Sequence, residues 1–219
     1  MGRRGVNVRR MDEYDWLEGE KTSNDILTWL SSTSLDIMCF QEMPVEMKGV
    51  VSKSLDGATV KYASNRAGTA IATKLKIVDF KPWIFEDENF ARGLVLDVIS
   101  PKSNDTIRVY NVHLQSVGLV GDDYDAFRSG PGTEQSKKLW SRLSSAFSLR
   151  SAQTTVLRAS IDSSPYPVLL CGDFNDTPVS FALSTLRSGS PKLFDAFALA
   201  GAGLGSTYVG DIPGLRIDY

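Results

Sequence analysis

The chain has 219 residues, of which 42% are hydrophobic and 23% charged, values that fit one globular domain and exclude a disordered chain. Its net charge of −2 is a mild argument against DNA as a substrate, because phosphate contacts supply most of the affinity of nucleic-acid binders. No apolar stretch approaches the ~20 residues that span a bilayer. The first residues lack the pattern of a signal peptide. We therefore expect a soluble domain, either cytoplasmic or anchored through a segment outside this sequence.

Hydrophobic patterning predicts many strands and a few helices. Residues 22–25 form a helix-capping pattern, and Ile26, Leu27 and Leu30 behind it would share one helical face. The predicted strands, in chain order, are residues 37–40, 59–63, 69–73, 94–99, 106–114 and 167–171, with a last strand beginning at residue 215. The further predicted helices are residues 46–55, residues 134–162 (continuous or in two pieces) and residues 180–186.

Several of these strands are apolar enough to be buried on both faces. This pattern predicts an α/β fold, a four-layer α/β sandwich in which two packed mixed β-sheets are flanked by helices. No linker divides the chain, so we expect a single domain over residues 1–219. The Gly- and Asp-rich residues 118–133 are expected to form a surface loop near the site. Cys39 and Cys171 lie inside apolar runs and are interpreted as buried free thiols.

Polar and acidic side chains end four of the apolar runs. They are Gln41 and Glu42, Asn111 and His113, Asp173 and Asn175, and Asp218. The two-residue period of a strand puts Asn111 and His113 on one side, and likewise Asp173 and Asn175. Both pairs can therefore point into one pocket. Carboxylates, amides and one imidazole suit Mg²⁺ or Mn²⁺ rather than zinc.

Five short motifs occur in order along nearly the whole chain: V-N-V-R at residues 6–9, C-F-Q-E at 39–42, N-V-H-L at 111–114, G-D-F-N at 172–175 and R-I-D-Y at 216–219. They resemble the motifs of the endonuclease/exonuclease/phosphatase superfamily. That superfamily includes pancreatic deoxyribonuclease, exonuclease III-type enzymes and inositol polyphosphate 5-phosphatases. The resemblance implies the same sandwich fold and a metal-dependent phosphoesterase.

The resemblance also implies a role for each matching residue. Glu42 would hold the divalent metal, and Asn7 would support the metal shell or the phosphate. Asp173 would orient or deprotonate the attacking water, and Asn175 would hold the scissile phosphate. His113 would stabilise or protonate the phosphoryl region, with Asn111 beside it. Asp218 would orient a histidine from the family's final segment. Tyr208 is a weaker candidate for a substrate-facing aromatic.

Two departures from the family pattern stand out. Family members continue after R-I-D-Y into a strand with an Asp-His pair, whereas this sequence ends at Tyr219 and its single histidine is His113. We therefore expect that the domain, as given by this sequence, lacks the C-terminal strand that carries the Asp-His pair. Val6 also stands where the family often has Tyr.

The resemblance implies a divalent-metal-dependent phosphoester hydrolase of the phosphodiesterase or nuclease type, in which water attacks phosphorus in line. A first alternative is a phosphatase or phospholipase-like enzyme acting on a phosphorylated lipid, inositol or metabolite. A second is a non-catalytic binding module, or an inactive truncated fragment, on the same scaffold. The expected cofactor is Mg²⁺ or Mn²⁺. The expected partner is a phosphoester substrate (nucleic acid, phospholipid or small phosphorylated metabolite), with no protein partner inferred and a monomer expected.

Overall fold

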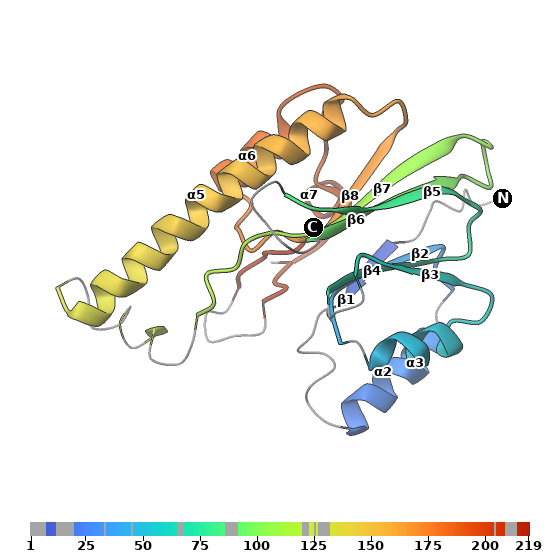
Figure 1. The fold of residues 1–219 in the computed structure, drawn as a ribbon, viewed down its shortest axis with the longest axis horizontal. Coiled ribbons are helices and arrows are strands. Elements are labelled where there is room, and N and C mark those ends of the chain that lie inside the picture. Colours follow the sequence, from blue (N-terminus) through green and yellow to red (C-terminus); the bar gives the residue numbers. More distant parts are fainter. Residues whose placement is uncertain are drawn as a thin grey trace. The chain divides into compact units, whose positions relative to one another are not determined.

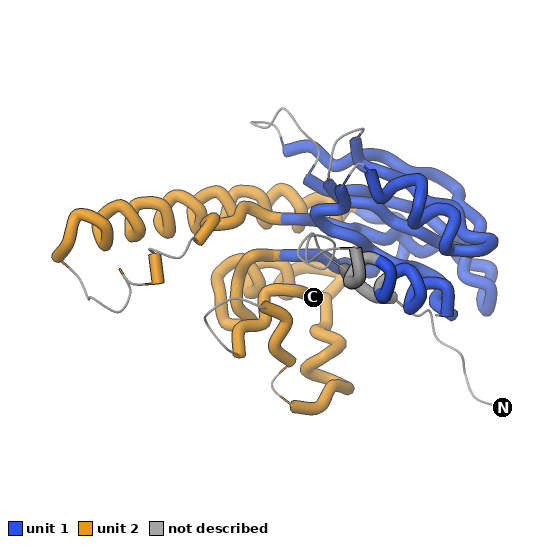
Figure 2. Tube along the Cα trace, turned by 90° about the horizontal axis from the view of Figure 1, so that it is seen from below, with its two compact units in different colours: residues 1–113, 164–173 blue, residues 114–163, 174–219 orange. Residues whose placement is uncertain are grey.

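A computed structural model describes residues 8–11, 20–32, 34–44, 46–64, 68–85, 92–119, 123–124, 126, 132–203, 205–208 and 214–219. The chain forms two compact units, coloured separately in Figure 2. The first comprises residues 1–113 and 164–173, and the second comprises residues 114–163 and 174–219. The expectation that residues 1–219 form a single domain stays a prediction.

The first unit contains two four-stranded mixed sheets (Figure 1). One has the order β1-β2-β4-β3, with β1 Val8–Met11, β2 Ile37–Met43, β4 Gly68–Thr73 and β3 Thr59–Tyr62. The other has the order β5-β6-β7-β8, with β5 Ile77–Trp83, β6 Gly93–Ile99, β7 Thr106–His113 and β8 Val168–Asp173. The pairs β1–β2 and β7–β8 are parallel, and the other pairs are antiparallel.

Strand β2 is buried on both faces, which explains its continuous apolar run. Ile37 and Cys39 belong to the core between the two sheets, with residues of β4, β6, β7 and β8. Met38 and Phe40, on the opposite face, belong to a second core with residues of helices α2 (Glu20–Ser32) and α3 (Met47–Ser54). In Figure 1 the two helices accordingly lie on one side of the first sheet and the second sheet on the other.

The two cysteines meet inside the core between the sheets. Both are free and buried, as predicted. The Sγ atoms of Cys171 and Cys39 lie 3.0 Å apart. The contact with Cys171, together with burial, raises the pKa of Cys39 well above its ordinary value. The Cys39 thiol therefore packs in its neutral form as a small apolar group.

The second unit includes the helices α5 Glu134–Asp162, α6 Phe181–Arg187 and α7 Ala196–Ala200. Each begins at a side chain that accepts a backbone N–H of its first turn, namely Thr133, Ser180 and Asp195. Helix α5 is one continuous helix of 29 residues that packs against α6. Among the helices that the structure describes, none is long and apolar enough to cross a membrane.

The prediction of two mixed sheets with helices is confirmed, and the individual differences have simple causes. Strand β5 was not predicted, because this edge strand is exposed along most of its length and carries Asp79, Lys81 and Pro82. The strand expected from residue 215 is absent from described residues 214–219. Most of the loop predicted at residues 118–133 lies outside the described residues.

Gly172 allows the close approach of β8 to β7. Its φ is 144°, and a Cβ built there would lie 1.8 Å from the carbonyl oxygen of Val112. We expect Gly172→Ala to lower the free energy of unfolding by about 3 kcal/mol or more, through backbone strain and overpacking. Urea unfolding of wild type and variant would measure this change in the free energy of unfolding.

Gly57→Ala is the matched control in the same unit. Gly57 also has a positive φ, 71°, but a Cβ added there would have no atom within 4 Å. Its substitution should cost about 1–2 kcal/mol from backbone strain alone. Equal destabilisation by the two substitutions would contradict the steric role of Gly172.

Candidate active site

Three of the expected site residues converge in the first unit. His113, at the end of β7, has its Nε2 3.5 Å from Oε1 of Glu42 and 3.8 Å from Oδ2 of Asp173. The β7–β8 register places His113 directly beside Asp173. The side chains are 17%, 29% and 11% exposed for His113, Glu42 and Asp173. They are therefore largely shielded from water, and Nε2 of His113 is itself buried.

An irregularity in β2 places Glu42. The register between β2 and β4 shifts between Phe40 and Met43. Glu42 itself has φ 51°, a left-handed conformation that is uncommon for residues other than glycine. Bulges next to active sites re-aim a side chain in this way. The sequence indicated that Glu42 follows an apolar run, but it did not show this local kink.

Asn111 lies in the same unit and is completely buried. Its Nδ2 donates to the carbonyl oxygens of Phe40 (3.0 Å) and Ala70 (2.9 Å), and its Oδ1 accepts from Nε2 of Gln41. Asn111 therefore holds the backbone immediately before Glu42. These contacts assign it a positioning function in the fold, which the strand pattern did not reveal.

The G-D-F-N motif extends into the second unit at Asn175. Nδ2 of Asn175 donates to the carbonyl oxygen of Leu114 at 3.1 Å, and φ of Asn175 is 50°. Strand β8 ends at Asp173. The two-residue alternation thus applies to Asn111 and His113, both within β7, but not to Asp173 and Asn175. The left-handed backbone at Asn175 ends the strand geometry on which that expectation depended.

The C-terminal residues of the second unit pack along this motif. The backbone N–H of Phe174 donates to the carbonyl oxygen of Ile217 at 2.9 Å, and the rings of Phe174 and Tyr219 lie 5.1 Å apart. Asp218 is buried, and its backbone N–H donates to Oγ1 of Thr207 at 3.2 Å.

Tyr208, the weaker candidate for substrate binding, is also described in the second unit. Its hydroxyl forms a hydrogen bond with the hydroxyl of Tyr124. Asn7, in contrast, lies outside the described residues.

Arg216, the first residue of the R-I-D-Y motif, forms an ion pair in which its guanidinium is buried. It pairs with Asp195, the N-cap of α7, and its guanidinium lies over the rings of Tyr219 and Phe197 at 4.4 and 5.0 Å. Burial alone would raise the pKa of Asp195, but hydrogen bonds from Arg216 and from the backbone N–H of Ala198 lower it below its ordinary value. Burial raises the pKa of Tyr219 to about 12.

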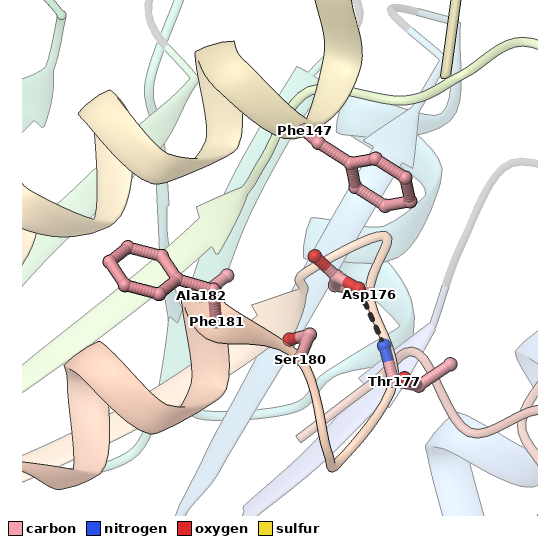
Figure 3. Close-up of a pocket in the computed structure, with 6 residues that line it drawn as sticks. All are labelled: Phe147, Asp176, Thr177, Ser180, Phe181 and Ala182. Atoms are coloured by element: carbon pink, nitrogen blue, oxygen red, sulfur yellow. Dashed lines mark hydrogen bonds between the residues drawn. The ribbon is translucent and has the colours of Figure 1, made fainter. Parts of the chain in front are cut away.

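A pocket of about 330 Å³ opens beside the loop that follows Asn175. Figure 3 shows its lining, with Phe147 projecting from α5 and Phe181 from α6. Asp176, Thr177 and Ser180 complete the lining with Ala182. Its volume lies in the range of small-molecule sites. Sequence patterns did not indicate it, because its aromatic walls come from separate helices.

The chemistry of the first-unit cluster fits a hard divalent cation. No group of three or more His, Cys, Asp or Glu side chains that could hold a metal occurs among the described residues. Mg²⁺, however, uses only one or two protein carboxylates and completes its shell with water and phosphate. Glu42 and Asp173 supply such carboxylates.

Packed mixed sheets with carboxylates and a histidine at strand ends fit the expected phosphoesterase-type α/β sandwich. Residues 7–219 match the Endonuclease/Exonuclease/phosphatase family, and the chain belongs to this family. The resemblance inferred from the five motifs is thereby confirmed. Members of the family are hydrolases that act on phosphoester bonds and generally use divalent metals such as Mg²⁺. A comparison with curated protein sequences finds no match.

Solved structures show the same fold at low sequence identity. Humanized D. rerio TDP2, carrying 14 mutations, superposes with a TM-score of 0.70 at 16% identity, over 97% of this chain and 81% of that chain. D. rerio TDP2 complexed with a single-strand DNA product gives 0.59 at 16% identity, over 84% and 64%. Sphingomyelinase C from Streptomyces griseocarneus gives 0.56 at 16% identity, over 83% and 68%. The predicted α/β sandwich is confirmed.

The ion pair of Arg216 with Asp195 yields a stability prediction. Asp195→Asn should lower the free energy of unfolding at pH 7 by about 1–3 kcal/mol, because the buried guanidinium keeps only a neutral partner. The folded-state pKa of Asp195 is lowered, so its stabilisation is present above the unfolded pKa of about 3.9 and is lost as pH falls through the folded-state value. The difference between wild type and variant should therefore shrink below that pH.

Urea unfolding at pH 7 and at acidic pH would measure both effects. Glu134→Gln is the control, because Glu134 pairs with Lys137 on the surface of α5, where such pairs contribute about 0.2–1 kcal/mol. A cost for Asp195→Asn no larger than this control would refute the structural role of the buried pair.

Proposed function

We propose that this protein is a divalent-metal-dependent phosphoester hydrolase of the phosphodiesterase or nuclease type. The observation that supports this most is the convergence of Glu42 and Asp173 on the imidazole of His113, at 3.5 and 3.8 Å. A carboxylate for a cation, a second carboxylate for a water proton and an imidazole for the phosphoryl oxygens are the groups that such a hydrolysis requires.

Each residue would have one part in the reaction. Glu42 would hold Mg²⁺ or Mn²⁺, which when bound offsets negative charge on the phosphate. Asp173 would orient the attacking water and accept its proton, while the water oxygen forms its bond to phosphorus and the ester oxygen departs on the opposite side. His113 would stabilise the phosphoryl oxygens or protonate them. Asn111 would act indirectly, by fixing the backbone that carries Glu42.

The family motifs support further proposed roles. Asn175 would hold the scissile phosphate, and its left-handed backbone with the hydrogen bond to Leu114 supports a fixed placement. Tyr208 would contact the substrate. From the family motifs we further propose that Asp218 orients a histidine and that Asn7 supports the metal shell or the phosphate.

The substrate class has two candidates. The similar TDP2 structure holds a single-strand DNA product, and another similar structure is a sphingomyelinase C. A nucleic acid and a phospholipid are therefore both consistent with the scaffold. The net charge of −2 favours the alternative of a phosphatase or phospholipase-like enzyme acting on a phosphorylated lipid, inositol or metabolite, since nucleic-acid binders usually present a basic face.

A hydrolysis panel tests the proposal. Plasmid DNA, RNA, bis-(p-nitrophenyl) phosphate, inositol phosphates and a phospholipid would each be incubated with Mg²⁺, with Mn²⁺ and with chelator. Metal-dependent turnover of any substrate supports the hydrolase and identifies its class. Intact metal binding without turnover across the panel would instead favour a non-catalytic binding module or an inactive fragment.

The metal assignment yields a direct prediction for Glu42. Glu42→Gln should abolish measurable Mg²⁺ or Mn²⁺ binding in calorimetry, because a neutral amide replaces the carboxylate that would hold the cation. Asp105→Asn removes an exposed carboxylate of the same unit and should leave the affinity unchanged. Unchanged metal affinity in Glu42→Gln would refute the assignment of Glu42 as the metal ligand.

His113 yields a kinetic prediction. His113→Ala should reduce hydrolysis by about two orders of magnitude or more, the usual contribution of an acid–base group. The rate would be measured on the best substrate of the panel, with circular dichroism to verify folding. A rate equal to that of wild type would make His113 a structural residue.

A further inference from the structure

Arg150 is the largest completely buried side chain in the described residues, with 1% of its surface exposed. It lies on α5, in the second unit. A buried guanidinium is costly unless its donors are matched by acceptors. Its Nε donates to Oδ2 of Asp176 at 3.0 Å, its Nη1 donates to the carbonyl oxygen of Gln115 at 2.7 Å, and its charge lies 4.8 Å from the ring centre of Phe147.

Gln153 binds the same loop from the same face of α5. It follows Arg150 by three residues, which puts both side chains on one side of the helix, and it is also buried. Its Oε1 accepts the backbone N–H of Gln115 at 3.0 Å. Helix α5 therefore holds both backbone polar groups of Gln115.

The two loops held by Arg150 are those that continue from the candidate catalytic strands. Gln115 follows His113 by two residues, and Asp176 follows Asn175 directly. The loops also contact one another, because Nδ2 of Asn175 donates to the carbonyl oxygen of Leu114. Arg150 thus connects the loop at residues 114–116 to the loop at residues 174–177.

We propose that Arg150, assisted by Gln153, is a positioning residue for hydrolysis: its contacts with Gln115 and Asp176, here called the Arg150 clamp, fix the spacing of the two loops and so the placement of Asn175. This inference rests on the proposed function. Arg150 itself would not contact the substrate. Because a misplacement of a catalytic group by about 1 Å can reduce a rate by about 100-fold, loss of the Arg150 clamp should lower the rate of hydrolysis.

Arg150→Lys is the first test. Lysine keeps the charge but not the planar fork that donates in two fixed directions. We expect kcat to fall by about tenfold or more, while divalent-metal affinity in calorimetry stays within about twofold, because the clamp holds loops and not the metal carboxylate.

Arg158→Lys is the matched control on the same helix. Arg158 is also buried and pairs with Asp162 and with the carbonyl oxygen of Leu186, none of which belongs to the two loops. The kcat of Arg158→Lys should stay within about threefold of wild type. Equal losses in the two variants would overturn the clamp and make both arginines merely structural supports of α5.

Chemical rescue separates positioning from folding. Arg150→Ala should regain part of its kcat when guanidinium is added at concentrations below those that unfold the protein, whereas Arg158→Ala should not. If Arg150→Ala does not fold, Gln153→Leu replaces it, because it keeps the buried ion pair and removes the acceptor for the N–H of Gln115. A lowered kcat with unchanged metal affinity in this variant supports the clamp, and an unchanged kcat contradicts it.

Hydrogen exchange gives a readout that needs no activity. In Arg150→Lys the amides of residues 114–116 and 174–177 should exchange faster than in wild type, while those of α6 should not. Absence of turnover in wild type would refute the proposed function, and accelerated exchange would then still show that the clamp holds the loops. Turnover in wild type, with unchanged kcat and unchanged exchange in Arg150→Lys, would refute the clamp alone.

Discussion

The parallel pairing of β7 with β8 is the constraint on which the candidate site depends. It brings His113 directly beside Asp173, two residues so distant in the sequence that neither helix nor turn geometry could join them. The pairing tolerates no side chain at position 172, where a Cβ would overlap the carbonyl oxygen of Val112. The glycine of the G-D-F-N motif is therefore a packing requirement of the sheet, and its aspartate follows at the strand end, where a reacting group can be reached.

Buried polar side chains give the site its rigidity. Asn111 uses both its amide nitrogen and its oxygen to hold the irregular part of β2, from which Glu42 projects. In the second unit Arg150 contacts, in a similar way, the loops that continue from the candidate catalytic strands. Such groups are costly when unsatisfied and fix one conformation when satisfied, so residues that never touch the substrate can decide the geometry of those that would.

The family assignment and the particular chemistry have different support. The family match over residues 7–219 and the common fold show a phosphoesterase scaffold. Metal use, water activation and the substrate class are proposals that depend on the cluster of Glu42, His113 and Asp173. The proposals for the two units can be tested separately. Measuring the metal affinity of Glu42→Gln tests the role of Glu42 in the first unit. Measuring kcat and hydrogen exchange in Arg150→Lys tests the role of Arg150 in the second.

The sequence alone determined the two mixed sheets, most strand positions, the buried thiols and the family, because apolar periodicity and short motifs are local properties of the chain. Only the tertiary structure decided how the candidate residues are held. The left-handed backbone at Glu42 and Asn175 depends on strand pairing and on loop contacts, and so it overrode the alternation expected for Asp173 and Asn175. Arg150 looked like one more charged residue on a long helix, because its burial comes from loops that precede and follow that helix in the sequence.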